Sequence, residues 1–445
     1  MWRDDTPLTA AEIMELDRYC AERGIELVPS LSSFGHLYKL LCTREYAHLC
    51  ELEGSKSEPF SLDGRMRHHM INPVDPESIA LIKRMIGEYM ELFSSRQFNL
   101  CADETFDLGQ GKSKEAVEKY GRHMVYIHYV KELAQFLIDN GRRPMFWGDI
   151  ILGFPEMVKE LPEEMICLNW GYAWDQDEEP IRKMHEAGAI QYCCPGCNSW
   201  NRFVPANVDG YNNISRLCSY AAKYGAEGVL NTDWGDFLHI NHPDMSRAGM
   251  IYGAAFSWNH DILSMEEINR QISRLEYHDY SEQLLSILSG VQENTAFSWY
   301  FACLFVQKRQ GIGGFDQLYL QEEEKFLKEI VHVDERNERL REIRQELYQH
   351  ISRLDRDRKY LIKAYLIGMD GLILTNEIGK MLAVNEYGQN YADLPDCLEL
   401  AKKVEIWLYH YKEEYRTVSK EGELHRIEEI FCWYADYLRD CKVKH

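Results

Sequence analysis

The chain has 445 residues, of which 45% are hydrophobic and 27% are charged, and its formal net charge is -22 at pH 7. A single hydrophobic core usually stops growing at about 250–300 residues, so more than one domain is expected. The excess of acidic residues argues against partners such as nucleic acid or an anionic membrane surface, because both bind to basic patches.

The cysteines and the N-terminal residues together predict a cytoplasmic location. The chain has 13 cysteines, an odd number without regular spacing, which is typical of reduced thiols in a reducing compartment. The sequence from Met1 to Asp17 has no basic segment followed by an apolar run, so it does not look like a signal peptide. No apolar stretch approaches the ~20 residues that a membrane-spanning helix needs.

Helix and strand patterns alternate along the first part of the chain. Thr9 and Glu12 form a capping box, and the helix that it starts is predicted over residues 7–22. Each predicted strand after the first is preceded by a helical pattern, and this strict alternation is typical of parallel βα units. Six strands are predicted, at residues 25–29, 98–103, 144–149, 165–172, 190–196 and 228–234.

The predicted strands have similar carboxyl ends, where five of the six carry tryptophan, tyrosine or a carboxylate. An open doubly wound sheet binds ligands in one crevice, whereas a closed barrel draws ligand-binding groups from every strand end. The repeated polar and aromatic endings therefore favour an α/β fold of the (β/α)8 TIM-barrel type. With about six strands, this barrel is expected to be incomplete on its N-terminal side.

From about residue 265 onward, no strand pattern is present. The segments 283–308, 320–354, 357–383 and 395–416 are long, charged and amphipathic, which predicts helices. Their aromatic and leucine stripes are expected to form a core. We therefore predict a barrel domain over residues 1–262 and an all-helical C-terminal domain over residues 263–445.

Asp103 and Glu104 stand side by side where the second predicted strand ends. Placing two acids at the end of a buried strand costs free energy, because charges are poorly solvated in a low-dielectric interior. If the strand continues to Asp103, this side chain shares a face with Asn99 and Cys101. The segment alone leaves two interpretations open: a solvated acidic pair that opens a loop, or a catalytic pair on the rim of a barrel.

Tryptophans stand at the carboxyl ends of four of the predicted strands. Trp147, Trp170, Trp200 and Trp234 each stand beside glycine, asparagine, serine or aspartate. A single tryptophan at such a position is usually part of the core, because it is large and apolar with one N–H group to satisfy. Four of them favour an aromatic pocket with a few polar groups, which suits a sugar ring. A small carbohydrate is therefore the predicted ligand.

No motif indicates a metal or a cofactor. Cys194 and Cys197 form a C-x-x-C motif, but no second pair follows at the spacing of a zinc site. His239 and His242 are too sparse for a metal site without a surrounding set of carboxylates. We therefore predict neither a metal nor a cofactor.

Taken in order, five motifs resemble bacterial glycoside hydrolases of family 20, the β-N-acetylhexosaminidases. The motifs are Leu27-Val28-Pro29 with Phe34-Gly35-His36, Asn99–Thr105, Phe146–Asp149, Pro195-Gly196 with Ser199-Trp200-Asn201, and Thr232–Asp236, and the resemblance covers roughly residues 8–260. It implies an exo-acting enzyme that hydrolyses terminal β-linked N-acetylglucosamine or N-acetylgalactosamine with retention of configuration. In this family the acetamido oxygen of the substrate attacks the anomeric carbon, so the enzyme supplies no nucleophile.

The resemblance also implies roles for individual residues. Glu104 is expected to protonate the leaving oxygen and later to activate water. Asp103 is expected to accept a hydrogen bond from the acetamido N–H and to stabilise the positive charge of the oxazolinium intermediate. Tyr172 is the candidate that holds the acetamido oxygen. The expected substrate-binding residues are His36, Trp147, Trp170, Tyr172, Trp200, Asp233, Trp234 and Asp236.

One departure from the family pattern leaves alternatives open. Family members have two barrel strands before the helix predicted at 7–22, and the first carries an arginine that binds sugar hydroxyls. The chain is therefore expected to be N-terminally truncated, to be completed by another chain, or to have lost activity, and we favour truncation. Three functions follow: a hydrolase, a sugar-binding protein without turnover, or a degenerate barrel whose helical domain serves oligomerisation or interaction, with a homo-oligomer as one expected assembly.

Overall fold

The structure is a computed structural model that describes residues 5–57, 59–66, 69–259, 261–313 and 316–441. By their internal contacts, the residues divide into two compact units. Unit 1 comprises Met1–Gly171, Gln176–Pro195 and Leu217–Leu230, and unit 2 comprises Tyr172–Asp175, Gly196–Arg216 and Asn231–His445. Each unit combines several separate segments of the chain, so these units do not test a single domain boundary after residue 262. That boundary stays a prediction.

Unit 1 contains five parallel strands that form a curled half-barrel, with neighbours in the order β1-β2-β3-β4-β5. They are β1 (Gln97–Asn99), β2 (Arg143–Trp147), β3 (Ile166–Trp170), β4 (Ile190–Cys194) and β5 (Gly228–Val229). The register pairs Asn99 with Met145 and Trp147 with Leu168, so the carboxyl ends of the strands lie along one edge of the sheet. The parallel α/β fold predicted from the sequence is confirmed.

The first predicted strand, at 25–29, is not a regular strand in the structure. Only Ser30 forms a bridge, which is parallel to Asn99, and the Asn99 amide donates to the carbonyl of Pro29 at 2.9 Å. The Leu31 amide in turn donates to the Asn99 carbonyl at 3.0 Å. The segment therefore runs beside β1 but pairs over too few residues to form a sixth strand.

Helical segments separate the strands of unit 1 along the chain, as the alternating pattern predicted, although only 3₁₀ turns lie between β2 and β3. Helix α1 begins after Thr9, whose hydroxyl accepts the Glu12 amide at 3.3 Å while the Thr9 amide donates to the Glu12 carboxylate at 2.7 Å. This confirms the capping box. The helices before β5 are α1 (Ala10–Ala21), α2 (Tyr38–Leu41), α3 (Leu62–Met66), α4 (Pro76–Met90), α5 (Lys114–Tyr120), α6 (Arg122–Asp139), α7 (Glu179–Glu186) and α8 (Asn207–Lys223). Short 3₁₀ turns lie at η1 (Ala47–Leu49), η2 (Ser55–Ser57), η3 (Ile151–Gly153) and η4 (Pro155–Glu160).

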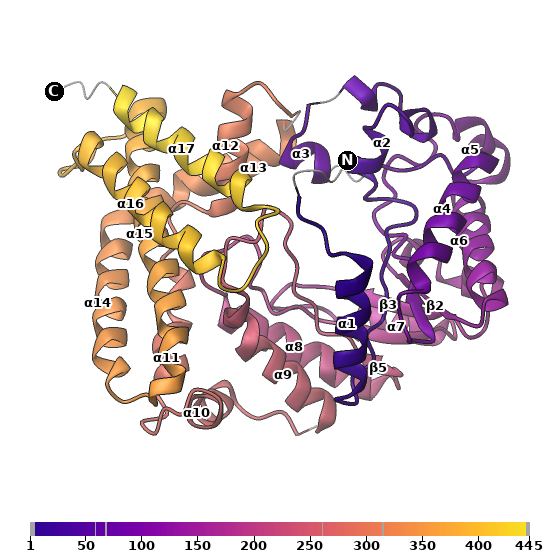
Figure 1. The fold of residues 1–445 in the computed structure, drawn as a ribbon, viewed down its shortest axis with the longest axis horizontal. Coiled ribbons are helices and arrows are strands. Elements are labelled where there is room, and N and C mark those ends of the chain that lie inside the picture. The colour runs from indigo at the N-terminus through magenta and orange to yellow at the C-terminus, as the bar shows by residue number, and fades with distance from the viewer. Residues whose placement is uncertain (1–4, 58, 67–68, 260, 314–315, 442–445) are drawn as a thin grey trace. The chain divides into compact units, whose positions relative to one another are not determined.

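Every regular element that the structure describes after Asn231 is helical, which confirms the predicted helical C-terminal region. Helices α14, α15, α16 and α17 lie side by side in sequence order (Figure 1). Aromatic residues form part of their core, where Trp299 stacks on Phe431 with ring centroids 5.3 Å apart. The elements are η5 (Pro243–Ser246), α9 (Arg247–Trp258), α10 (Met265–Leu275), α11 (Leu284–Ser289), η6 (Gln292–Asn294), α12 (Trp299–Arg309), α13 (Asp316–Glu329), η7 (Ile330–His332), α14 (Val333–Ile351), η8 (Arg356–Arg358), α15 (Lys359–Tyr387), α16 (Cys397–Tyr415) and α17 (Leu424–Asp440).

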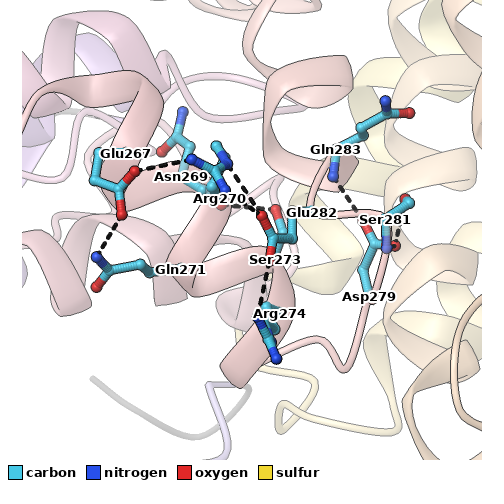
Figure 2. A network of polar contacts seen from close by, with 10 residues as sticks. All are labelled: Glu267, Asn269, Arg270, Gln271, Ser273, Arg274, Asp279, Ser281, Glu282 and Gln283. Atoms are coloured by element: carbon cyan, nitrogen blue, oxygen red, sulfur yellow. Dashed lines mark hydrogen bonds and ion pairs between the residues drawn. The ribbon is translucent and has the colours of Figure 1, made fainter.

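A polar network fixes the turn between α10 and α11 (Figure 2). Its exposed part joins Arg270 to Glu282 at 2.7 Å, a type of ion pair that contributes little to stability. Its buried part is Asp279, which accepts the amides of Gln283 and Leu284, both at 2.9 Å, at the start of α11. Burial opposes ionisation, but hydrogen bonds from Ser281, His350 and these amides lower the pKa of Asp279 to about 2.

None of the helices within the described ranges is both long enough and apolar enough to span a membrane.

Candidate active site

The acid pair follows β1 on a backbone that leaves the extended conformation. The strand ends at Asn99, and Cys101, Ala102 and Glu104 have φ angles of 58°, 64° and 49°. The expectation that Asn99, Cys101 and Asp103 share one face of a strand is therefore wrong, because side chains alternate only on extended backbone. Left-handed conformations cost ~1–3 kcal/mol per residue outside glycine, and they concentrate at functional sites.

Neighbouring side chains hold this left-handed segment in place. The Cys101 amide donates to the side chain of Asn99 at 2.9 Å, and the Trp147 amide donates to the Cys101 carbonyl at the same distance. The Tyr126 hydroxyl donates to the carbonyl of Ala102 at 3.0 Å. The Cys101 amide and the carbonyls of Cys101 and Ala102 thus keep hydrogen-bond partners in the left-handed conformation, which offsets part of the strain.

His36 lies against both acids. Its Nε2 atom is 3.2 Å from an oxygen of Asp103 and 3.3 Å from an oxygen of Glu104. Gly35 permits this approach, because a Cβ atom there would lie 2.7 Å from the Asp103 carbonyl oxygen. Burial lowers the pKa of His36, but hydrogen bonds and charges from the two acids outweigh it and raise this pKa to about 10. His36 is therefore an imidazolium at neutral pH.

Asp149 is a fourth member of this cluster, and the sequence interpretation missed it. The Glu104 amide donates to one oxygen of Asp149 at 2.9 Å, and the other oxygen is buried without a hydrogen-bond partner among the described residues. Burial, followed by the charges of Asp103 and Glu104, raises the pKa of Asp149 to about 7. The motif Trp147-Gly148-Asp149 contained the signal, a carboxylate at a strand end, but only its tryptophan was selected. We call His36, Asp103, Glu104 and Asp149 the acid cluster.

Three members of the acid cluster are also donors of the kind that bind divalent metals. The ligand atoms of His36, Asp103 and Glu104 lie within 4.8 Å of one another. A metal would have to displace the proton that His36 retains up to a pKa of about 10. We therefore interpret the cluster through proton chemistry.

Two of the predicted tryptophans belong to unit 1. Trp147 ends β2 and is buried, and Trp170 ends the adjacent β3 and is partly exposed. The pairing of Trp147 with Leu168 places both strand ends on the edge of the sheet that β1 also reaches. Their expected role in binding a sugar stays a prediction.

Three other predicted residues come together within unit 2. The indole N–H of Trp234 donates to the Tyr172 hydroxyl at 2.9 Å, and the rings of Tyr172 and Trp200 meet edge to face at 5.2 Å. Gly196 makes room for them, because a Cβ atom there would lie 2.6 Å from the Trp200 ring. We call Tyr172, Trp200 and Trp234 the aromatic cluster.

The two predicted aspartates of unit 2 contact the loop that carries Trp200. The carboxylate of Asp233 accepts the hydroxyls of Ser199 and Ser246. Asp236 accepts the side-chain amide of Asn201 at 3.4 Å. Both carboxylates therefore have protein partners, and their binding to sugar hydroxyls stays a prediction.

A cavity of about 610 Å³ lies within unit 2, and Tyr172, Asn198, Trp200 and Asn201 are among the residues that line it. Binding sites for small molecules typically have volumes of about 300–1,000 Å³. Asn198 and Asn201 have φ angles of 54° and 59°, so this loop is also held in the left-handed conformation. The cavity thus combines aromatic rings with fixed amide groups.

Comparison with known proteins shows what the chain is similar to. Residues 3–198 match the family described as glycosyl hydrolase family 20, catalytic domain. The chain is 25% identical to hexosaminidase D of Bos taurus over 176 residues, which are 38% of this chain and 47% of that protein. It is 26% identical to hexosaminidase D of Homo sapiens over 178 residues, 38% of this chain and 34% of that protein. The chain thus spans less than half the length of these curated relatives.

Two solved structures align with the chain at low sequence identity. A β-N-acetylhexosaminidase from Bacteroides fragilis is 16% identical and aligns with a TM-score of 0.46 over 63% of this chain and 57% of its own. A chitobiase from Flavobacterium johnsoniae is 15% identical, with a TM-score of 0.45 over 93% of this chain and 68% of its own. The family match ends at residue 198, so Trp200 and Trp234 lie beyond it.

Proposed function

We propose that the protein is a retaining, exo-acting β-N-acetylhexosaminidase, because residues 3–198 match the glycosyl hydrolase family 20 catalytic domain. The observation that carries the proposal is the acid cluster, in which His36 contacts both Asp103 and Glu104. The cluster lies within the matched segment, and two of its members, His36 and Glu104, have a left-handed backbone that costs free energy to maintain.

In the first step of the proposed reaction, the acetamido oxygen of the substrate forms a bond to the anomeric carbon. The bond from this carbon to the leaving oxygen breaks, and Glu104 donates its proton to that oxygen. Asp103 accepts a hydrogen bond from the acetamido N–H and stabilises the positive charge of the oxazolinium intermediate. In the second step, water attacks the anomeric carbon, the bond from this carbon to the acetamido oxygen breaks, and water gives a proton to Glu104, which restores the acid and the acetamido group.

The other members of the acid cluster have supporting roles in this proposal. The charge of His36 stabilises the carboxylate of Asp103 and the carboxylate that Glu104 becomes after it has donated its proton, and its Nε2 atom contacts both side chains. Asp149 fixes the backbone of Glu104 through its amide. The orientation of the catalytic acid thus depends on groups that do not react.

We assign substrate binding to the tryptophans and to Tyr172. Tyr172 holds the acetamido oxygen, and Trp170, Trp200 and Trp234 pack against the sugar and its acetamido group. His36, Trp147, Asp233 and Asp236 complete the proposed set. The edge-to-face contact of Tyr172 with Trp200 supports this assignment, because it fixes both rings beside one cavity.

A second candidate is a protein that binds N-acetylhexosamines without hydrolysing them. The number of strands favours it, because the described part of the sheet has five and a closed barrel of this type has about eight. Binding without turnover needs the aromatic side chains but not the acid Glu104.

Hydrolysis of N,N′-diacetylchitobiose distinguishes the two candidates. We expect turnover by the full chain, a loss of at least ~10²-fold in Glu104→Gln, and no change in the control Glu118→Gln on the exposed side of α5. Binding of a thiazoline analogue of the intermediate without any hydrolysis would favour the second candidate. If the protein neither hydrolyses N,N′-diacetylchitobiose nor binds the thiazoline analogue, both candidates are contradicted.

A further inference from the structure

The cavity of unit 2 has a second wall, opposite in character to the aromatic one. Beyond Tyr172 and Trp200, it is lined by Arg202, by residues at the start of α8, and by residues of η6, α12, α13 and α14. At about 610 Å³ it has room for more than one sugar ring. This wall is charged, and the proposed roles of the predicted residues do not use it.

Arg202 is the unusual residue of this wall. Its only hydrogen bond in the described structure joins Nη1 to the Trp200 carbonyl at 3.3 Å. A guanidinium carries five N–H donors, and an arginine enclosed by protein normally has a carboxylate partner. Among the residues that the structure describes, no carboxylate lies within ion-pair distance of Arg202. Burial lowers the pKa of Arg202, and only the more distant charge of Asp209 opposes this.

A second arginine of the same cavity shows the usual arrangement. Arg336 forms an ion pair with Glu329 and donates to the carbonyl of Thr295. It therefore has its partners within the protein, and it neutralises one of the acids that line the wall. Lys325 also lines the cavity but is exposed to solvent. Among the described residues of this wall, Arg202 is thus a cation that is partly enclosed by protein and has no acidic acceptor.

Acidic residues that line the cavity oppose the binding of an anion near Arg202. Asp209, Glu293 and Glu322 line the cavity and would repel one. Asp209 lies in the first turn of α8, where the helix dipole favours negative charge, and this offsets part of its effect on a nearby anion. An anionic group is therefore favoured only where it contacts the Arg202 guanidinium directly, and not elsewhere in the cavity.

We infer that Arg202 binds an anionic group of the sugar ligand, so that the substrates of this protein are acidic N-acetylhexosaminides. The group is a carboxylate, a sulfate ester or a phosphate ester, because each presents two oxygens to the planar fork of a guanidinium. The anion is carried either by the N-acetylhexosamine ring that packs on Tyr172 and Trp200 or by the leaving group. This inference rests on the proposed function for the identity of the sugar.

Calorimetric binding measurements on the full chain can test the inference and locate the anion. The first pair of probes is N-acetylglucosamine and its 6-phosphate, and the second is β-N-acetylglucosaminyl glucose and β-N-acetylglucosaminyl glucuronic acid. We expect the acidic member of one pair to bind at least ~10-fold more tightly than the neutral member, as charge-assisted hydrogen bonds allow. The pair that responds identifies which part of the substrate carries the anion.

Three variants connect the preference to Arg202. Arg202→Met is expected to abolish the preference for the acidic probe without weakening the binding of the neutral probe. Arg202→Lys is expected to retain part of this preference. Arg216→Met is the matched control, because this arginine lies exposed on α8 and does not line the cavity. A thermal unfolding curve for each variant separates a loss of binding from a loss of folding.

The outcomes also separate this inference from the proposed function. Equal affinities within both pairs, or a preference that persists in Arg202→Met, would overturn the inference and leave the hydrolase proposal standing. A preference that depends on Arg202, in a protein that does not hydrolyse N-acetylhexosaminides, would support the anion site and contradict the hydrolase. Binding of none of the four probes would overturn the inference together with the sugar assignment.

Discussion

The acid cluster of unit 1 and the aromatic cluster of unit 2 are built in different ways. The acid cluster brings one imidazolium and three carboxyl groups together, with His36 and Glu104 on left-handed backbone, and the charges of Asp103 and Glu104 raise the pKa values of His36 and Asp149. The aromatic cluster is fixed by one hydrogen bond, from Trp234 to Tyr172, and by one edge-to-face contact. The first arrangement is suited to moving protons, and the second to holding a ring in a fixed position. Substitutions should therefore affect turnover in one cluster and binding in the other.

The largest effect is expected from Asp103→Asn. Asparagine keeps the shape of the side chain but removes the charge that stabilises the oxazolinium intermediate, so kcat on N-acetylhexosaminides should fall by about 10²–10³-fold with little change in KM. Steady-state kinetics of this variant and of the exposed control Asp139→Asn check the prediction. An unchanged kcat would rule out substrate assistance by this residue.

Asp149 should control both turnover and the pH dependence of stability. Its pKa of about 7 lies above the usual 3.8, so the folded state binds its proton more tightly and stability falls as pH rises from about 4 to 7. Asp149→Asn removes this titration. The melting temperature of the variant minus that of the native protein should therefore increase as pH rises over this range. Asp149→Leu removes the acceptor of the Glu104 amide, and we expect about a tenfold loss in kcat, the order of one misplaced hydrogen bond.

The contribution of His36 to stability should be lost as pH rises, whereas the contribution of a carboxyl group with a lowered pKa is lost as pH falls. Its pKa of about 10 is raised above 6.5, so the stability that the imidazolium contributes is present below pH 6.5 and is lost as pH rises toward 10. His36→Asn should therefore destabilise the protein at pH 6 and much less at pH 10. A difference in melting temperature that stays constant over this range would contradict the pairing of His36 with the two acids.

A smaller effect is expected in the aromatic cluster. Trp234→Phe keeps an aromatic ring but removes the N–H that donates to Tyr172, which should raise KM by about 2–10-fold, the net worth of one hydrogen bond, with little change in kcat. Trp174→Phe, at a position that is 55% exposed, is the matched control. If Trp234→Phe lowered kcat and left KM unchanged, this would contradict the assignment of turnover to the acid cluster and binding to the aromatic cluster.

The sequence predicted what depends on local pattern, and it failed where the structure depends on tertiary contacts. The capping box of Thr9 and Glu12 and the alternation of helices and strands are local, and both are confirmed. The left-handed turn at Cys101 and Ala102 was not predicted, because it is held by Tyr126 and by the backbone of Trp147, which are distant in the sequence.

The same reasoning explains what was missed in the candidate site. His36 was selected, but its contact with Asp103, 67 residues away, carries no signal in a single sequence. Asp149 is unusual through its burial beside two other acids, which only the folded arrangement creates. Trp200 and Trp234 were selected from their place at the ends of predicted strands, and the structure brings both to Tyr172.

The dependence of the Glu104→Gln defect on the leaving group tests the central claim most directly. A general acid matters most when the leaving oxygen is strongly basic, as in a sugar, and least when it departs readily as an anion. We therefore expect a loss of at least ~10²-fold on N,N′-diacetylchitobiose and a much smaller loss on the 2,4-dinitrophenyl N-acetyl-β-glucosaminide. An equal loss on both substrates would contradict the assignment of Glu104 as the acid that protonates the leaving oxygen.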